Sequence, residues 1–359
     1  MTTVLYILLA ILIFGFLIFI HELGHFIAAK LSKVQVNEFS INMGPKLLQK
    51  KRGETTYSLR LIPIGGYCAM EGEDGETGNP RAFASAKWWK RLIILCAGSF
   101  MNFLTGFVIM ALIIGISWPA MRTLEITGFM DGCTLCGEEG LHEGDVIYAL
   151  DGKRTYLYGD FSIITERSAD DVFDVTVIRD GQKVTLRDFE MRKQELTDDE
   201  GNTKLYYGLL LGGVEKNNFF NTFKYASYEC ADFTRMVWWG LSDLITGRAS
   251  FKDVSGAVGV VDVMVQSGKE ADSFGEAVET ILTLAAFIAV NLAVMNMLPI
   301  PALDGGRVFL LLISTAFTAI TKKKINPKYE AYIHAAGMVL LLALMGVLIV
   351  KDVITIVQR

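Results

Sequence analysis

The sequence predicts a polytopic α-helical membrane protein with four transmembrane helices and one soluble domain inserted between the second and the third. The chain of 359 residues is 52% hydrophobic and has a mean hydropathy of +0.37, more than an ordinary soluble domain carries. Four apolar stretches each approach the roughly 20 residues that a helix needs to cross a hydrocarbon core about 30 Å thick. A charged stretch, in which apolar and polar residues alternate, separates the second from the third.

The four predicted spans cover residues 4–31, 92–118, 277–298 and 332–350. The first has no charge before Glu22 and lacks the basic start and the cleavage site of a secretory signal peptide, so we expect it to remain as a membrane anchor. A further apolar run at 308–320 is too short to cross comfortably, which predicts an interfacial or re-entrant segment.

The distribution of lysine and arginine predicts the orientation. Neither residue type precedes Lys30, whereas the connection between the first two spans is rich in both. The connection after the third span is also basic, with Arg307 and several lysines. Because Lys and Arg favour the cytoplasmic side, we expect both connections there and both termini, with the inserted domain, outside.

Residues 119–220 predict a compact β-rich domain. Short alternating runs surround Asp-Gly turns at 151–152 and 180–181, and a helix-like stretch lies near 160–167. The plainer interpretation is an inserted spacer.

The next stretch, 221–274, begins with an aromatic-rich amphipathic pattern typical of a helix lying on the membrane. Simple packing against the other helices and a role in gating substrates are both open for it. The predicted domains are thus residues 1–118, 119–220, 221–274 and 275–359.

The end of the first span carries the sequence HELGH, which places His21 and His25 four residues apart. On a helix both imidazoles project from one face, about one turn apart, and can bind one metal ion. Glu22 lies beside this pair, where a carboxylate can take a proton from a water molecule that attacks a peptide carbonyl. Two imidazoles and a carboxylate suit zinc, which leaves one tetrahedral position open.

This short motif also occurs by chance, and a polar helix end can be a simple interfacial cap. The membrane setting favours function, because a charged residue at mid-membrane costs about 2.5 to 3.5 kcal/mol on insertion scales. A third ligand is needed, and Asp304 is the candidate, in the sequence NMLPIPALDGGRV after the third span. The prolines there prevent a regular helix and the glycines permit a sharp turn. Without HELGH, a turn or helix-capping aspartate would be the better interpretation.

Three motifs together resemble the site-2 protease family, and in particular its bacterial RseP-type branch. They are HELGH in the first span, GSFMN at 98–102 in the second, and PALDGG at 301–306 after the third. The likeness extends through LIPIGGYCAMEGED at 61–74 and KWWKRLIILCAGSFMNF. It covers both membrane halves of the chain.

The resemblance implies Zn²⁺ held by His21, His25 and Asp304, with Glu22 as general base and later proton donor. It also implies a membrane-dipping β-hairpin around 63–70 that pairs with an unwound substrate as an added strand, which would expose one scissile carbonyl. The expected substrate-binding residues are therefore Gly65, Gly66 and Tyr67, together with Asn102 and Asn296. Either asparagine could instead hydrogen-bond between helices.

The inserted domain, with the sequence GLHEGDVIYALDGK, is similar to the PDZ domains of this family. The resemblance then implies an outer gate, a bacterial inner membrane location, and cleavage of single-span substrates such as anti-sigma factors or remnant signal peptides after a first cut. The sequence departs from the family where FMDGCTLCGEEG replaces small apolar residues, so the binding of carboxylate ends is open. Cys133 and Cys136 could form a disulfide or a redox sensor, or stay unpaired.

Two other function classes remain to be weighed. A metal transporter would need polar residues along a path, and the last two spans supply few. A catalytically silent scaffold would retain no zinc, and the intact HELGH argues against it. The formal net charge of −5 provides no basic surface for phosphates, so nucleic acid is not expected as a partner.

Overall fold

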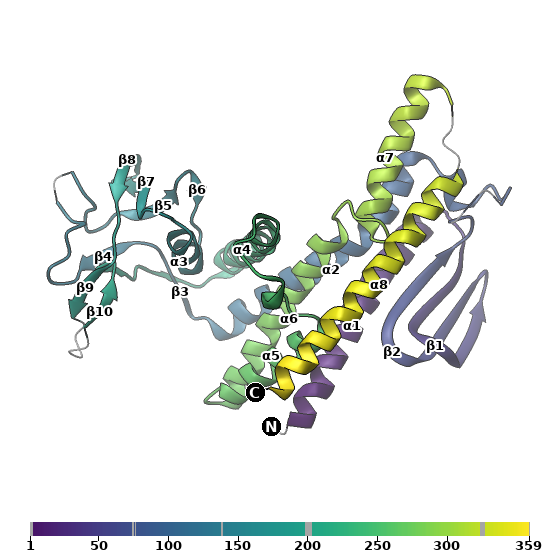
Figure 1. Cartoon of the computed structure of the whole chain (residues 1–359), viewed down its shortest axis with the longest axis horizontal. Coiled ribbons are helices and arrows are strands. Elements are labelled where there is room, and N and C mark those ends of the chain that lie inside the picture. Colours follow the sequence, from purple (N-terminus) through teal and green to yellow (C-terminus); the bar gives the residue numbers. More distant parts are fainter. Residues whose placement is uncertain are drawn as a thin grey trace. The chain divides into compact units, whose positions relative to one another are not determined.

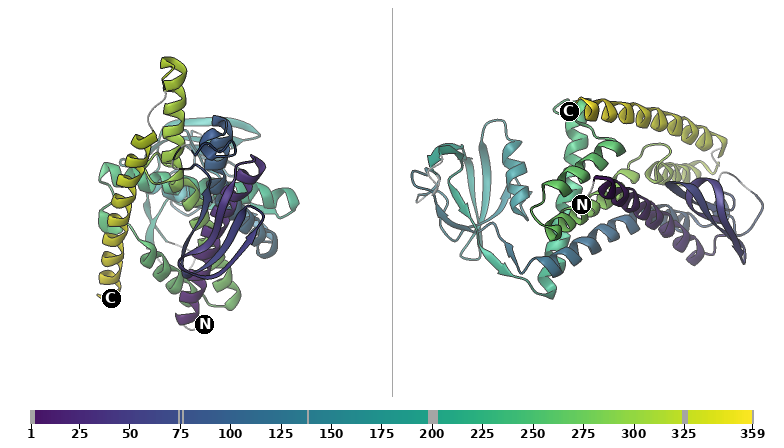
Figure 2. Two further views of the ribbon diagram at one scale, coloured as in Figure 1. Left: turned by 90° about the vertical axis from the view of Figure 1, so that its right-hand side faces the viewer. Right: turned by 90° about the horizontal axis from the view of Figure 1, so that it is seen from below.

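The computed structural model describes residues 3–73, 75, 77–137, 139–197, 203–323 and 327–358. It divides into two compact units: the membrane unit, Met1–Met110 with Phe233–Arg359, and the inserted unit, Ala111–Asp232. In the membrane unit, the beginning of the first helix and the end of the last lie at the same end of the helices (Figures 1 and 2).

Five helices of the described residues are long and apolar enough to cross a membrane. They are α1 (Thr3–Leu31), α2 (Trp88–Ser117), α6 (Phe274–Asn296), α7 (Asp304–Thr321) and α8 (Pro327–Val357). Four of them coincide with the four predicted spans. The fifth, α7, contains the run expected to be interfacial or re-entrant. The helix has 18 residues and is about 27 Å long. It is longer than the predicted run, because it begins one turn earlier, with Asp304–Arg307.

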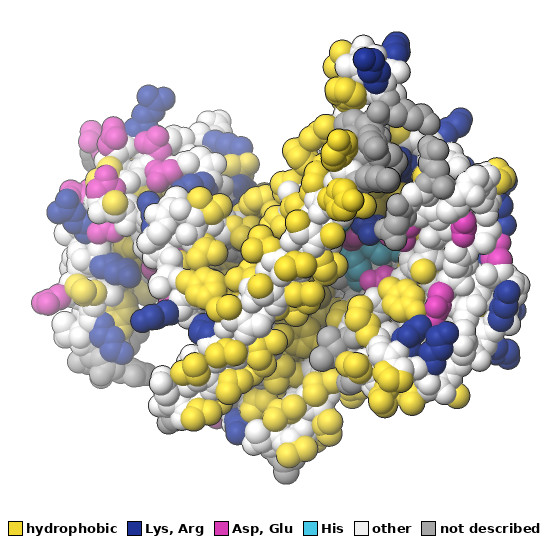
Figure 3. Space-filling view, turned by 45° about the vertical axis from the view of Figure 1, so that its right-hand side comes forward, with side chains coloured by type: hydrophobic (Ala, Val, Ile, Leu, Met, Phe, Trp, Pro, Cys, Tyr) yellow, Lys and Arg dark blue, Asp and Glu magenta, His cyan; other side chains and the backbone are white. Residues whose placement is uncertain are grey.

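The helices carry an apolar surface suited to lipid. In the 18-residue apolar stretch of each helix, only 6% of the residues of α8 and 17% of those of α1 are buried. Apolar side chains cover the face of the helices seen in Figure 3. An exposed apolar surface of this extent needs lipid around it. The structure is thus that of a multi-pass membrane protein.

The end of α8 is fastened to the short helix α5 (Ala257–Glu270). The buried carboxylate of Asp352 accepts a hydrogen bond from the Gly259 N–H at 2.8 Å, satisfying a donor of the first turn of α5. A Cβ on Gly256 would lie 2.8 Å from that carboxylate, and one on Gly259 within 3.2 Å. The sequence SGAVGVV at 255–261 thus provides glycines where α5 approaches Asp352 closely.

A long hairpin, β1 (Val36–Arg52) and β2 (Thr55–Met70), follows α1. β1 pairs antiparallel with β2, and both strands fold back on themselves. Residues 46–52 pair with 55–60, residues 56–59 also pair with 38–41, and residues 36–41 pair on their other side with 66–70. The segment Gly66–Met70, the edge strand, thus has one partner segment in the described part of the hairpin. The hairpin expected around 63–70 exists and is much longer than expected.

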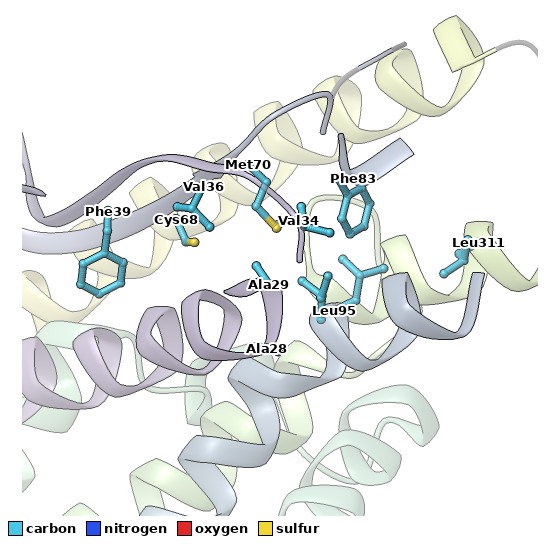
Figure 4. Packing of buried hydrophobic residues seen from close by; sticks show 11 residues of the cluster. Ala28, Ala29, Val34, Val36, Phe39, Cys68, Met70, Phe83, Leu95 and Leu311 are labelled. Atoms are coloured by element: carbon cyan, nitrogen blue, oxygen red, sulfur yellow. The ribbon is translucent and has the colours of Figure 1, made fainter. Parts of the chain in front are cut away.

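A buried cluster joins the hairpin to three helices (Figure 4). It contains Ala28 and Ala29 of α1, hairpin residues such as Phe39 and Met70, Leu95 of α2 and Leu311 of α7. Leu311 is 3% exposed and Ala29 is fully buried. The hydrophobic effect thus fixes the edge strand against the helices that carry the motifs.

Helix α4 (Phe219–Thr246) is amphipathic, as predicted for this stretch. Part of its apolar side chains is buried, and others are exposed in the described structure, including Phe219, Phe220, Trp238 and Ile245. Two short 3-10 turns are Phe83–Ser85 and Phe251–Asp253. Exposed aromatic residues on an amphipathic helix favour the membrane interface.

The inserted unit is β-rich, as predicted. Its strands are β3 (Ala120–Arg122), β4 (Ile126–Phe129), β5 (Val146–Leu150), β6 (Lys153–Arg154), β7 (Val172–Arg179), β8 (Gln182–Glu190), β9 (Gln194–Thr197), β10 (Thr203–Tyr206), β11 (Leu209–Leu211) and β12 (Val214–Lys216), with the helix α3 (Tyr158–Glu166). Four form a sheet in the order β6-β5-β7-β8, and β4 pairs with β11, β3 with β12 and β9 with β10.

The predicted turns and helix of this unit are present. Asp151 and Gly152 have φ of 49° and 69°, and Asp180 and Gly181 have φ of 51° and 77°, as hairpin turns with two left-handed residues require. The helix α3 matches the stretch predicted near 160–167. The likeness to a PDZ domain remains a prediction.

Candidate metal centre

The helix α1 brings His21 and His25 together as their spacing predicts. Their Nε2 atoms lie 3.2 Å apart, and the ring centroids are 4.8 Å apart at 81°. Leu, Ile and Phe dominate the preceding turns, and the helix continues unbroken to Leu31. Both imidazoles therefore aim at one point beside the helix.

Asp304, distant in sequence, joins this pair. Its Oδ2 atom lies 3.1 Å from His21 Nε2 and 3.2 Å from His25 Nε2. The three atoms form a nearly equilateral triangle. Ligand atoms about 2.0 Å from a tetrahedral zinc are about 3.3 Å apart, so the triangle has close to the size that zinc requires. This is the one group in the described residues where three such side chains converge on a metal-sized space.

The hydrogen bonding of His25 favours a cation at this point. Its Nδ1 lies 2.8 Å from the carbonyl oxygen of Ile94, and a carbonyl only accepts, so Nδ1 carries the proton. In the neutral form of the ring, Nε2 then directs its lone pair at Asp304. The buried Oδ2 of Asp304 has no hydrogen-bond partner among the described residues. Lone pairs that face each other repel unless a cation lies between them, so the residues fit a zinc ion.

A tight turn of the backbone positions Asp304. Ala302 has a φ of 76°, which is unfavourable for a residue with a side chain. Its N–H donates to Nδ1 of His334 in α8 at 3.1 Å. A Cβ on Gly337 of α8 would lie 2.4 Å from the Pro301 Cβ, so α8 approaches the turn very closely. Helix α8 thus holds the turn that ends at Asp304.

Glycine 98 of α2 is a site residue to which sequence analysis assigned no role. A Cβ at Gly98 would lie 2.4 Å from His25 Nε2 and 2.8 Å from His21 Nε2. Any side chain there would overlap the two imidazoles. The backbone of α2 therefore forms one wall of the metal centre. Gly98 opens the motif GSFMN, but nothing in that motif shows that the glycine faces the two imidazoles.

The two asparagines of the predicted site differ in position. Asn102 of α2 is 1% exposed, and its Nδ2 lies 3.4 Å from His21 Nδ1. Asn296 is the half-buried last residue of α6. In the described part of the chain its side chain makes no hydrogen bond to the metal-centre residues. The structure thus brings Asn102 to the centre.

The three hairpin residues of the predicted site face different neighbours. A Cβ on Gly66 would lie 3.3 Å from Glu22 Cγ, so the edge strand passes directly beside the Glu22 side chain. Gly65 has a φ of 85° and lies against Met43. The Tyr67 hydroxyl accepts a hydrogen bond from Arg60 at 2.5 Å, and burial, followed by the hydrogen bond to Glu38, raises the pKa of Tyr67. Gly66 is thus the residue that the structure places beside Glu22.

Comparison with known protein families identifies the chain. The model of Peptidase family M50 matches residues 9–344. The chain belongs to this family. The match confirms the resemblance to the site-2 proteases, which sequence analysis based on HELGH, GSFMN and PALDGG.

Individual relatives agree with this identification. A protein of Clostridium acetobutylicum named as a zinc metalloprotease is 36% identical over 351 residues, covering 97% of each chain. One of Fusobacterium nucleatum with the same name is 34% identical over 96% of this chain and 98% of its own. The regulator of sigma-W protease RasP of Bacillus subtilis is 26% identical over 96% of this chain and 97% of its own. The chain is thus a membrane zinc metalloprotease, and its bacterial relatives and apolar helices make it a multi-pass bacterial membrane protein.

Proposed function

We propose that this protein is an intramembrane endopeptidase whose zinc ion is held by His21, His25 and Asp304. The observation that supports the proposal most is the convergence of the three ligand atoms within 3.1–3.2 Å of one another. The three ligand atoms face a common point that a cation can occupy. When bound there, zinc supplies a Lewis acid that activates water and polarises a carbonyl.

Glu22 acts as the general base in this proposal. It neighbours His21 on α1, and its side chain lies against the edge strand at Gly66. It takes a proton from the attacking water and transfers it to the leaving amine, a role that carboxylates perform in comparable sites. The ligand side chains are largely buried, with exposed fractions of 12% for His21, 9% for His25 and 19% for Asp304. Burial of this extent strengthens electrostatic interactions at the site.

The substrate is bound in an extended form by the edge strand, Gly66–Met70. A transmembrane helix hides its peptide bonds, whereas strand addition presents single carbonyls and satisfies the substrate backbone. The one-sided pairing of this segment leaves N–H and C=O groups available to a further strand. Gly65 and Tyr67 shape the strand, and Asn102 and Asn296 are the amides that we assign to the substrate backbone.

The substrates are single-span membrane proteins whose outer part a first protease has already removed. They belong to the anti-sigma factors or the remnant signal peptides. The printed name of the B. subtilis relative, regulator of sigma-W protease, agrees with the first class. The inserted unit acts as a PDZ-like gate on the outer side. The chain crosses the bacterial inner membrane four times, by α1, α2, α6 and α8, with both termini outside and with α7 entering from the metal centre.

The test is a cleavage assay of the purified full chain in detergent with a single-span substrate. The wild type is compared with Glu22→Gln and with the wild type treated with a zinc chelator. We expect cleavage by the untreated wild type alone, with about one zinc per chain in both proteins. Cleavage that persists in chelator contradicts the metalloprotease mechanism. Zinc flux through sealed vesicles without cleavage would instead indicate a transporter.

A further inference from the structure

Glu73 follows the edge strand and forms an ion pair with Arg307 of α7. The two side chains are 20% and 34% exposed, so solvent screens this pair less than a fully exposed one. The other carboxylate oxygen of Glu73 accepts a hydrogen bond from the Met70 N–H at 3.4 Å. One carboxylate therefore joins the end of the edge strand to the first turn of α7.

Arg307 lies on the side of α7 that meets the hairpin. It is three residues after Asp304 and four before Leu311, and residues at these spacings share one side of a helix. Leu311 belongs to the cluster that also contains Met70 (Figure 4). The Glu73 contact thus restrains the helix turn that carries the Asp304 ligand.

The opposite end of the edge strand meets the other half of the site. Gly66 lies beside Glu22 of α1. Between the two ends is Cys68, and burial, followed by the nearby carboxylates of Glu22 and Glu73, raises the pKa of its thiol. The strand therefore spans from Glu22 to Glu73, with α1 at one end and α7 at the other.

We propose that the Glu73–Arg307 ion pair is a positioning contact that sets which peptide bond of the substrate is cut, because it fixes the edge strand relative to Asp304. This inference rests on the proposed function, in which the edge strand binds the substrate. Residues along a strand are about 3.3 Å apart. If the edge strand moves by half of this distance, the bound substrate moves with it. A neighbouring peptide bond of the substrate then lies as close to the metal centre as the bond that the wild type cuts.

The experiment maps the cuts made by the full chain in detergent in one single-span substrate. The variants are Glu73→Gln, Arg307→Gln and the charge-exchanged Glu73→Arg with Arg307→Glu. Mass spectrometry of the fragments gives the share of cuts at each bond, and zinc per chain is measured alongside. Glu54→Gln is the matched control, because Glu54 pairs with Arg81 at 2.6 Å and neither residue bonds to α7 in the described structure.

We expect each single variant to raise the share of cuts at neighbouring bonds by roughly threefold or more. The charge-exchanged variant should restore the wild-type pattern, and zinc content and the Glu54→Gln pattern should not change. Rescue by charge exchange separates a positioning contact from a general loss of packing. An unchanged cutting pattern in both single variants overturns the inference and leaves the proposed function standing. A wild type that cuts nothing overturns both.

Discussion

Replacing Gly98 with alanine should weaken zinc binding, since the added methyl group enters the metal centre. It would lie 2.4 Å from His25 Nε2 and 2.7 Å from His21 Cε1, where ordinary contacts begin at 3.4 Å. The rings or α2 must therefore move by about 1 Å, which is half of a zinc–nitrogen bond of about 2.0 Å. Overpacking of this kind costs about 1–3 kcal/mol. At 1.4 kcal/mol per factor of ten, the zinc Kd should rise by about 5- to 150-fold.

The assay for Gly98→Ala is competition for zinc with a chromogenic chelator, together with cleavage of a single-span substrate. The matched control is Gly15→Ala in α1, where the added Cβ has no heavy atom within 4 Å. This control should bind zinc as the wild type does, and its helix should gain up to about 1 kcal/mol from the better propensity of alanine. If Gly98→Ala binds zinc as tightly as the wild type and cleaves as fast, the reasoning on this wall of the site is refuted.

Two further predictions concern groups away from the ligands. His334→Asn keeps a hydrogen-bond acceptor near the Ala302 N–H, so this variant should retain most activity and zinc. His334→Leu leaves that N–H without an acceptor, so the turn before Asp304 should lose about 1–3 kcal/mol of stability. This second variant should therefore release zinc faster to a chelator. Equal zinc release by both variants would argue against this role of His334. Burial, and then Asp160, raises the pKa of Glu229 to about 7. Because the folded-state pKa exceeds the ordinary value of 4.5, the folded protein loses stability as pH rises from about 4.5 to 7, by at most roughly 3 kcal/mol. Glu229→Gln should therefore raise the melting temperature at pH 8 and not at pH 4.5, and the reverse order would be inconsistent with a buried carboxylate.

The sequence was most informative where the physical signal is local. Apolar length predicts α1, α2, α6 and α8, because the thickness of the bilayer demands it. The four-residue spacing of His21 and His25 predicts their convergence, because it is close to one helical turn. The prediction of Asp304 needed information beyond local spacing. Only its motif and its place after a span connected it with a pair of histidines far away in the chain.

The features missed in the sequence depend on tertiary contacts. Helix α7 is longer than its apolar run, because its first turn is polar and lies at the metal centre. Gly98 is required by the approach of two imidazoles from another helix. His334 had no chemical neighbours in sequence, yet the structure shows it bonded to the turn before Asp304. The hairpin extends through residues 36–70 although five of the nine residues 46–54 are charged.

The X-ray absorption spectrum at the zinc edge, recorded on the purified full chain, tests the metal centre most directly. The account predicts a first shell of nitrogen and oxygen alone, at about 2.0–2.1 Å, with the outer-shell scattering of two imidazoles. Sulfur at about 2.3 Å would contradict it, because zinc would then be held by a cysteine such as Cys68 or Cys96 in place of the His21, His25 and Asp304 set.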